Sequence, residues 1–433
     1  MENCHTGDVR KGRKYMTKKW LIVLTASLSL MMLGCPPKSE TGGGSPSGGS
    51  GGGDILVGEY GSMTGAQATF GQSTHNGIML AADEVNSAGG VNGRKIKVMS
   101  EDDQSKQEEA ANAVTKLISQ NSVIAVLGEV ASSSSIAAAP ICQSNKVPMI
   151  TPSSTNDAVT KKGDYIFRMC FTDSYQGEAL GNYAARDLKV KRAAVLTDVK
   201  SDYSTGLAAV FEKTFTAQGG KIVAHQSYAN GDSDFRSQLT SVKGTNPEIL
   251  FVPGYYTDIG QIAAQARDLG MKQPLVGGDG WESPKLIEIG GKALEGCYYS
   301  NHYFYGDPAS NVRTFVEKYK QRYGVNPDAL AALGYDTMKV LADAMKRAPK
   351  LDGPSLRDAI AATKGFSGVT GLINLGPDRN PVGKKLVIEE IKNGQLTLKA
   401  SVDPMAGKGG AAPAASSTQS TAMTSTTATT ATH

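Results

Sequence analysis

The chain alternates short apolar runs with longer helical patterns from residue 54 to about residue 175. The run Ile55–Gly58 predicts a strand, and residues 72–88 place Ile78, Ala81 and Val85 on one helical face. The run at 123–127 is almost continuously apolar, which is typical of a strand covered on both sides. The strands predicted in this part are 55–58, 95–99, 123–127 and 147–151, and the helices are 72–88, 107–119 and 132–143.

The same alternation repeats after about residue 175. Because strand–helix–strand units build parallel sheets through right-handed crossovers, two such blocks predict an α/β protein with two doubly wound lobes. Ligands of such sheets bind beyond the carboxyl ends of the strands. The strands predicted here are 192–197, 221–226, 248–253 and 274–277, and the helices are 176–188, 205–218, 233–242, 256–269, 307–323, 329–348 and 354–364.

The N-terminal segment has the pattern of an export signal. Lys18 and Lys19 precede an apolar run at 21–33, which is shorter than the roughly 20 residues that span a bilayer and therefore predicts a removable segment. The run ends in a small residue followed by Cys35, which resembles the lipobox of bacterial lipoproteins. We therefore expect residues 1–34 to be a signal peptide, and Cys35 to be acylated and to anchor the protein to a membrane.

Three further segments have no pattern that predicts a packed core. Residues 1–15 are basic and unpatterned, and a misassigned start codon explains them best. Residues 35–53 begin with the cysteine and continue as a Gly/Ser-rich stretch, which predicts a flexible linker. Residues 405–433 are mostly Ala, Ser, Thr and Gly and predict a disordered tail.

The charge balance gives no sign of a nucleic-acid partner. The sequence has 45 basic and 41 acidic residues, a net charge of +4, and residues 1–34 hold six of the basic and two of the acidic ones. The remaining chain therefore has 39 of each sign. Without a basic stripe, binding to nucleic acid or to an anionic membrane surface is not expected.

The sequence offers few candidates for catalytic or metal-binding residues. The five histidines are scattered without ligand spacing, and the serines at 132–135 have no base near them in sequence. No CxxC pair occurs. Cys142 and Cys170 lie among apolar residues and are interpreted as buried thiols, and whether two of Cys142, Cys170 and Cys297 form a disulfide is left open. These patterns favour a protein that is not an enzyme and that has no metal or cofactor.

Two loops of the first lobe are rich in small hydroxyl residues. Residues 128–135 and 151–157 each lead from a predicted strand end, and Ser/Thr hydroxyls with free backbone N–H groups suit an anion. The alternative is helix capping by Ser132 and Thr155. Two such loops side by side favour a binding site.

The second lobe offers a negative charge among aromatic residues. Tyr203, Tyr255 and Tyr256 follow predicted strands, and Asp279 follows the strand at 274–277. This combination suits a ligand ammonium group, although Asp279 lies in a Gly-rich stretch that is also typical of a turn. An anion site in one lobe and a cation site in the other indicate a zwitterion.

Residues 54 to about 404 resemble the type I periplasmic binding proteins of ABC transporters, specifically the branched-chain (Leu/Ile/Val) amino acid-binding family, in its lipoprotein form. The resemblance implies an α/β fold of two doubly wound parallel-sheet lobes joined by hinge crossovers, a Venus-flytrap. It implies a first lobe of 54–174 plus 304–365 and a second of 175–303 plus 366–404, with hinge strands near 173–176, 300–304 and 365–368. The motifs that carry it are Gly61–Gly65, Phe70–Gly71, Ala88–Gly93, Glu101–Asp103, Gly128–Ser135, Thr151–Thr155, Asp198–Tyr203 and Gly254–Tyr256.

The resemblance also implies ligand contacts for this sequence. Asp279 matches an acidic position, often Glu, that pairs with the ligand ammonium, and Phe70 matches an aromatic position that touches the ligand side chain. Tyr203 and Tyr255 match aromatic walls, and Trp281 fits either the pocket or the core. The positions that match the holders of the carboxylate and of part of the ammonium group are Ser132, Ser133, Ser153, Ser154 and Thr155.

The function implied is that of a periplasmic, membrane-anchored lipoprotein that captures an α-amino acid and delivers it to the permease subunits of an ABC importer. We expect a monomer that closes on its ligand. Residue 279 is Asp where the family often has Glu, so its carboxylate is one methylene shorter. The identity of the ligand therefore stays open. The alternatives are a receptor of the same fold for urea, a short amide, an aromatic acid or another small carboxylate, a sensor that acts through a partner, and, least favoured, an anchored hydrolase.

Overall fold

The computed structural model describes residues 53–404. The expected signal peptide, Cys35, nearly all of the linker and the C-terminal tail lie outside the described residues. Within 53–404, none of the helices combines the length and the apolar character needed to cross a membrane.

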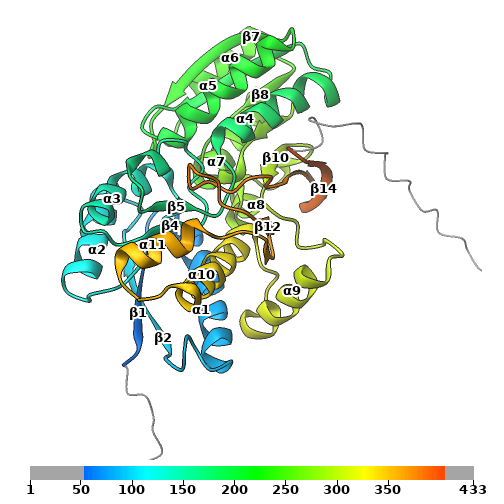
Figure 1. Cartoon of the computed structure of the whole chain (residues 1–433). Coiled ribbons are helices and arrows are strands. Elements are labelled where there is room, and N and C mark those ends of the chain that lie inside the picture. Colours follow the sequence, from blue (N-terminus) through cyan, green and yellow to red (C-terminus); the bar gives the residue numbers. More distant parts are fainter. Residues whose placement is uncertain (1–52, 405–433) are drawn as a thin grey trace, which may run out of the picture. The chain divides into compact units, whose positions relative to one another are not determined.

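The first lobe is built on a parallel sheet with the strand order β2-β1-β3-β4-β5 (Figure 1). Neighbouring strand residues alternate between its faces: Leu127 and Ile150 pack with α1, α10 and α11, whereas Val126 and Met149 pack with α2 and α3. Both faces are therefore covered, as the apolar runs predicted. The elements are β1 (Ile55–Gly61), α1 (Ala68–Ser87), β2 (Ile96–Asp102), α2 (Gln107–Ser119), β3 (Val126–Leu127), α3 (Ser132–Ser144), β4 (Met149–Thr151), β5 (Ile166–Arg168), α9 (Ser310–Tyr323), α10 (Ala329–Arg347) and α11 (Gly353–Ala361).

The second lobe contains a sheet with the order β14-β13-β10-β9-β8-β6-β7 (Figure 1). Five of its strands are parallel, but β13 and β14 add an antiparallel edge that the sequence pattern did not predict. The elements are α4 (Asp173–Asn182), β6 (Arg192–Asp198), α5 (Asp202–Ala217), β7 (Lys221–Tyr228), α6 (Arg236–Gly244), β8 (Ile249–Phe251), α7 (Tyr256–Asp268), β9 (Leu275–Gly277), α8 (Pro284–Gly290), β10 (Tyr298–Asn301), β13 (Leu386–Lys392) and β14 (Gln395–Val402).

The chain passes between the two lobes after β5, after β10 and before β13. The segment 173–176, expected as a hinge strand, is instead the first turn of α4, because the Thr172 hydroxyl accepts a hydrogen bond from the Tyr175 backbone N–H. The boundary expected at 365/366 also differs from the packing. Ile373 and Leu375, which follow the hairpin of β11 (Phe366–Gly368) and β12 (Gly371–Ile373), lie in the apolar cluster of the first lobe.

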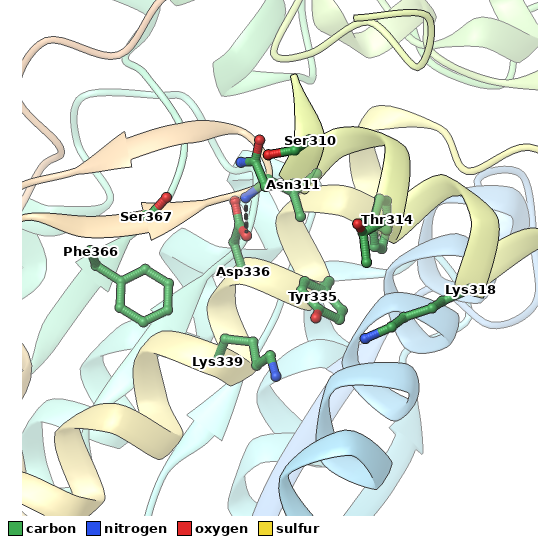
Figure 2. A pocket seen from close by; sticks show the side chains of 11 residues that line it. Ser310, Asn311, Thr314, Lys318, Tyr335, Asp336, Lys339, Phe366 and Ser367 are labelled. Carbon is green, nitrogen blue, oxygen red and sulfur yellow. Dashed lines mark hydrogen bonds between the residues drawn. The ribbon is translucent and has the colours of Figure 1, made fainter. Parts of the chain in front are cut away.

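Glu84 of α1 joins three helices of the first lobe. It accepts hydrogen bonds from Lys318 of α9 at 2.8 Å and from Tyr335 and Lys339 of α10 at 2.6 and 2.9 Å. Burial alone would raise the pKa of Glu84, but these bonds lower it to about 2. Lys318, Tyr335 and Lys339 line a cavity of about 300 Å³ between α9, α10 and the β11–β12 hairpin, and Figure 2 shows how their side chains lie. Since Glu84 already binds both ammonium groups, we assign this cavity no ligand.

The thiols Cys142, Cys170 and Cys297 are buried and free of disulfides. Burial raises the pKa of all three thiols, that of Cys170 to about 12. They are therefore packing residues, as the apolar sequence surroundings of Cys142 and Cys170 indicated.

Candidate functional site

Loops at the carboxyl ends of strands from both sheets meet around a narrow cavity. Seven of the nine ligand-binding residues expected from the sequence line it, together with three that were not expected. The expected ones are Phe70, Ser132, Ser153, Thr155, Tyr203, Tyr255 and Asp279, and the others are Val130, Gly280 and Leu330.

The first-lobe wall consists of hydroxyl groups at the start of α3 and after β4. Ser153 Oγ is buried and has no hydrogen-bond partner in the described protein. Helix α3 begins after Ala131 without a side-chain cap, and no α-helix begins at Thr155. The capping alternative therefore explains neither Ser132 nor Thr155. Both residues line the cavity, and Ser132 Oγ also accepts a hydrogen bond from the Asn156 backbone N–H at 3.2 Å.

The remaining two serines hold the structure around the cavity. Ser133 Oγ donates to Asp202 Oδ2 at 2.8 Å and accepts from the Asp202 backbone N–H at 3.0 Å, which links α3 of the first lobe to α5 of the second. Ser154 Oγ donates to the backbone oxygens of Glu129 and Val130 at 2.8 and 3.0 Å. Ser133 thus bridges the lobes, and Ser154 ties the two serine loops together.

Aromatic rings form a wall that crosses between the lobes. Phe70 of α1 meets Tyr255 edge-on, with ring centroids 5.5 Å apart, and Tyr255 stacks on Tyr203 at 5.3 Å. Burial, followed by the charge of Asp279, raises the pKa of Tyr203 well above its usual range, so its hydroxyl stays neutral. Trp281, which fitted either pocket or core, is fully buried outside the cavity and donates to the Val252 carbonyl at 3.0 Å.

Asp279 provides the negative charge of the second lobe. It follows β9 and is only 6% exposed. Oδ2 lies 2.8 Å from Nε2 of His302, whereas Oδ1 is buried without a partner in the described protein. The backbone N–H of Asp279 donates to Gln176 Oε1 at 2.8 Å, which fixes the turn in place. An exposed turn residue would not be held in this way.

Sequence reasoning missed the two residues that position Asp279. Gln176 comes from α4 and His302 from the end of β10, and each reaches Asp279 across the fold. His302 falls within the segment expected to be a hinge, which was the one signal available for it.

A family model described as periplasmic binding protein matches residues 54–395. The chain belongs to this family. It is similar to a leucine-binding protein from Thermotoga maritima, with 39% identity over 81% of this chain and 99% of that one, at a TM-score of 0.78. It is also similar to the Streptococcus pneumoniae branched-chain amino acid transporter substrate-binding protein in complex with isoleucine, with 34% identity, coverage of 81% and 100%, and a TM-score of 0.76.

A third similar structure carries a different ligand. A solute-binding protein of an ABC transporter from Rhodopseudomonas palustris, in complex with 3,4-dihydroxybenzoic acid, is 28% identical over 81% of this chain and 97% of that one, with a TM-score of 0.72. The resemblance to the branched-chain amino acid group and the two-lobed fold are confirmed. The similar proteins are binding proteins of transporters, which supports a role without catalysis.

Proposed function

We propose that this protein captures an α-amino acid, branched-chain or related, between its two lobes and delivers it to the permease of an ABC importer. The observation that carries the proposal is one cavity with an unpartnered hydroxyl on one side and an unpartnered carboxylate oxygen on the other. These are Ser153 Oγ of the first lobe and Asp279 Oδ1 of the second. A zwitterion satisfies both, since its carboxylate accepts and its ammonium donates.

The remaining lining accounts for the ligand side chain. Phe70, Val130 and Leu330 offer apolar surface beside the polar groups. Because each lobe carries half of the contacts, the ligand stabilises the closed form through interactions that an open form lacks. We infer that the closed monomer docks on the permease on the periplasmic side, and that residues 54–174 and 175–303 form the bulk of the two lobes.

Ligand screening by thermal unfolding tests this proposal. We expect L-leucine, L-isoleucine or L-valine to raise the melting temperature of the purified protein, because a ligand that binds only the folded state stabilises it. Urea, acetamide and 3,4-dihydroxybenzoate serve as the comparison set. If one of these compounds raises the melting temperature and none of the amino acids does, the ligand is neutral or purely anionic and the zwitterion proposal is wrong.

We also propose that Cys35 anchors the protein through an acyl chain, with the linker to residue 53 giving the receptor room to reach its permease. The wild-type protein is expected to enter the detergent phase in a Triton X-114 partition of expressing cells. The Cys35→Ser variant is expected in the aqueous phase, because it lacks the acylated thiol. A wild-type protein that stays in the aqueous phase contradicts the anchor.

A further inference from the structure

His302 lies between two cavities. Its partner Asp279 lines the cavity of the candidate site, whereas His302 lines a separate cavity of about 360 Å³. The second cavity also contacts the exposed residues Asp307, Leu372 and Lys385, so it opens to solvent. The bond of 2.8 Å between His302 Nε2 and Asp279 Oδ2 therefore links a residue that lines the candidate site to a residue that lines the second cavity.

The surroundings of His302 fix its orientation. The side chain is buried at 6% exposure and stacks on Phe171 with ring centroids 3.9 Å apart. Because Asp279 accepts at Nε2, the neutral ring carries its proton there, and Nδ1 remains the atom that takes up a second proton. Nδ1 is buried, and in the described protein no donor occupies its lone pair.

We propose that His302 couples amino acid binding to the release of a proton. With His302 neutral, the full charge of Asp279 is available to the ligand ammonium at Oδ1. With His302 protonated, the pair is neutral overall and a second cation lies beside the ammonium, so the ligand binds less tightly. The proposal rests on the proposed function and makes His302 a positioning residue that tunes the charge of Asp279 without touching the ligand.

Other ionisable groups also face the pair. Asp173 has a buried carboxyl whose pKa is raised well above its usual range by burial and by the charge of Asp279, and it is the competing candidate for a pH dependence of binding. Burial lowers the pKa of Lys384, whose ammonium donates to Thr370. The groups around the pair are Arg168 at the end of β5, Cys170 after it, Asp173 in α4, Tyr203 in α5, Tyr255 before α7, and Asp307, Lys384 and Lys385 in the cavity that His302 lines.

Calorimetric titration with L-leucine between about pH 5.5 and pH 8 tests the proposal. The affinity of the wild-type protein is expected to fall by about tenfold toward the acid end. At intermediate pH, titrations in two buffers of different ionisation enthalpy should differ in apparent binding enthalpy, because binding releases a proton into the buffer. Equal enthalpies in both buffers would overturn the coupling, and this measurement needs no variant.

The His302→Gln variant separates His302 from Asp173. Glutamine keeps an N–H donor for Asp279 but carries no charge, so the affinity of this variant is expected to be nearly independent of pH. His225→Gln is the matched control, since His225 is an exposed residue of β7 that also pairs with a carboxylate, that of Glu212 of α5 at 2.8 Å. It should keep the wild-type slope. If His302→Gln binds L-leucine with the same pH dependence as the wild type, the proton belongs to another group and the proposal is overturned. If the wild type binds no L-leucine at any pH, the proposed function itself is contradicted.

Discussion

Replacing Asp279 by asparagine is expected to weaken the binding of L-leucine by about 10- to 100-fold. The substitution keeps the shape of the side chain and an acceptor for His302, but it removes the charge that faces the cavity. A hydrogen bond to a charged group contributes about 1.5–3 kcal/mol, and Oδ1 is the unpartnered atom available for it. Isothermal calorimetry at pH 8 measures the loss, and the melting temperature without ligand shows whether the variant is folded.

A ligand without an ammonium group provides the internal control. The binding of 4-methylpentanoate, which has the leucine skeleton without its amine, should not weaken in Asp279→Asn, because removing the carboxylate also removes repulsion. Asp258→Asn is the matched variant: Asp258 is a buried acid of the same lobe, on α7, outside the cavity lining. If both aspartate variants lose L-leucine affinity equally, the effect is structural and Asp279 is not an ammonium partner.

Helices were predictable where their apolar residues recur at helical spacing on one face. The interpretation of 107–119 as a helix agrees with α2, and that of 329–348 agrees with α10, whose start is fixed by Asp328 accepting from the Ala331 backbone N–H at 2.8 Å. The strands β5 and β13 escaped prediction because each carries a buried charged residue. Arg168 ends β5 and Glu389 lies in the middle of β13, so neither segment has the apolar pattern of an interior strand.

The sequence predicted only those cavity-lining residues whose position follows from the carboxyl ends of the strands. Strand carboxyl ends of a parallel sheet share one edge, which is why Ser153 and Asp279 could be placed near a ligand. Which of two neighbouring serines faces the cavity depends on rotation about the helix, so Ser132 lines the cavity while Ser133 bonds to Asp202. Contacts such as that of Gln176, 103 residues from Asp279, leave no trace in a local pattern.

Arg168 connects the unpredicted strand β5 to the site. Its side chain is fully buried and donates to the carbonyl oxygens of Ser154 and Asn156 at 2.9 and 2.8 Å, and to Asn380 Oδ1 at 2.7 Å. The first two acceptors flank Thr155, so the guanidinium holds the hydroxyl loop of the candidate site. The third lies in the segment that leads back to the second lobe.

Replacing Arg168 by methionine is therefore expected to cost about 3 kcal/mol or more of unfolding free energy. Methionine fills much of the space but removes all three hydrogen bonds, one of them to the buried carbonyl oxygen of Ser154. Urea titration measures the loss, with Arg322→Met as the control, because Arg322 pairs with Asp83 at the surface and its removal should cost about 1 kcal/mol or less. Since the loop loses its support, Arg168→Met should also bind L-leucine more weakly in the absence of urea. Equal stabilities for the two arginine variants would show that the hydrogen bonds of Arg168 contribute no more than a surface ion pair.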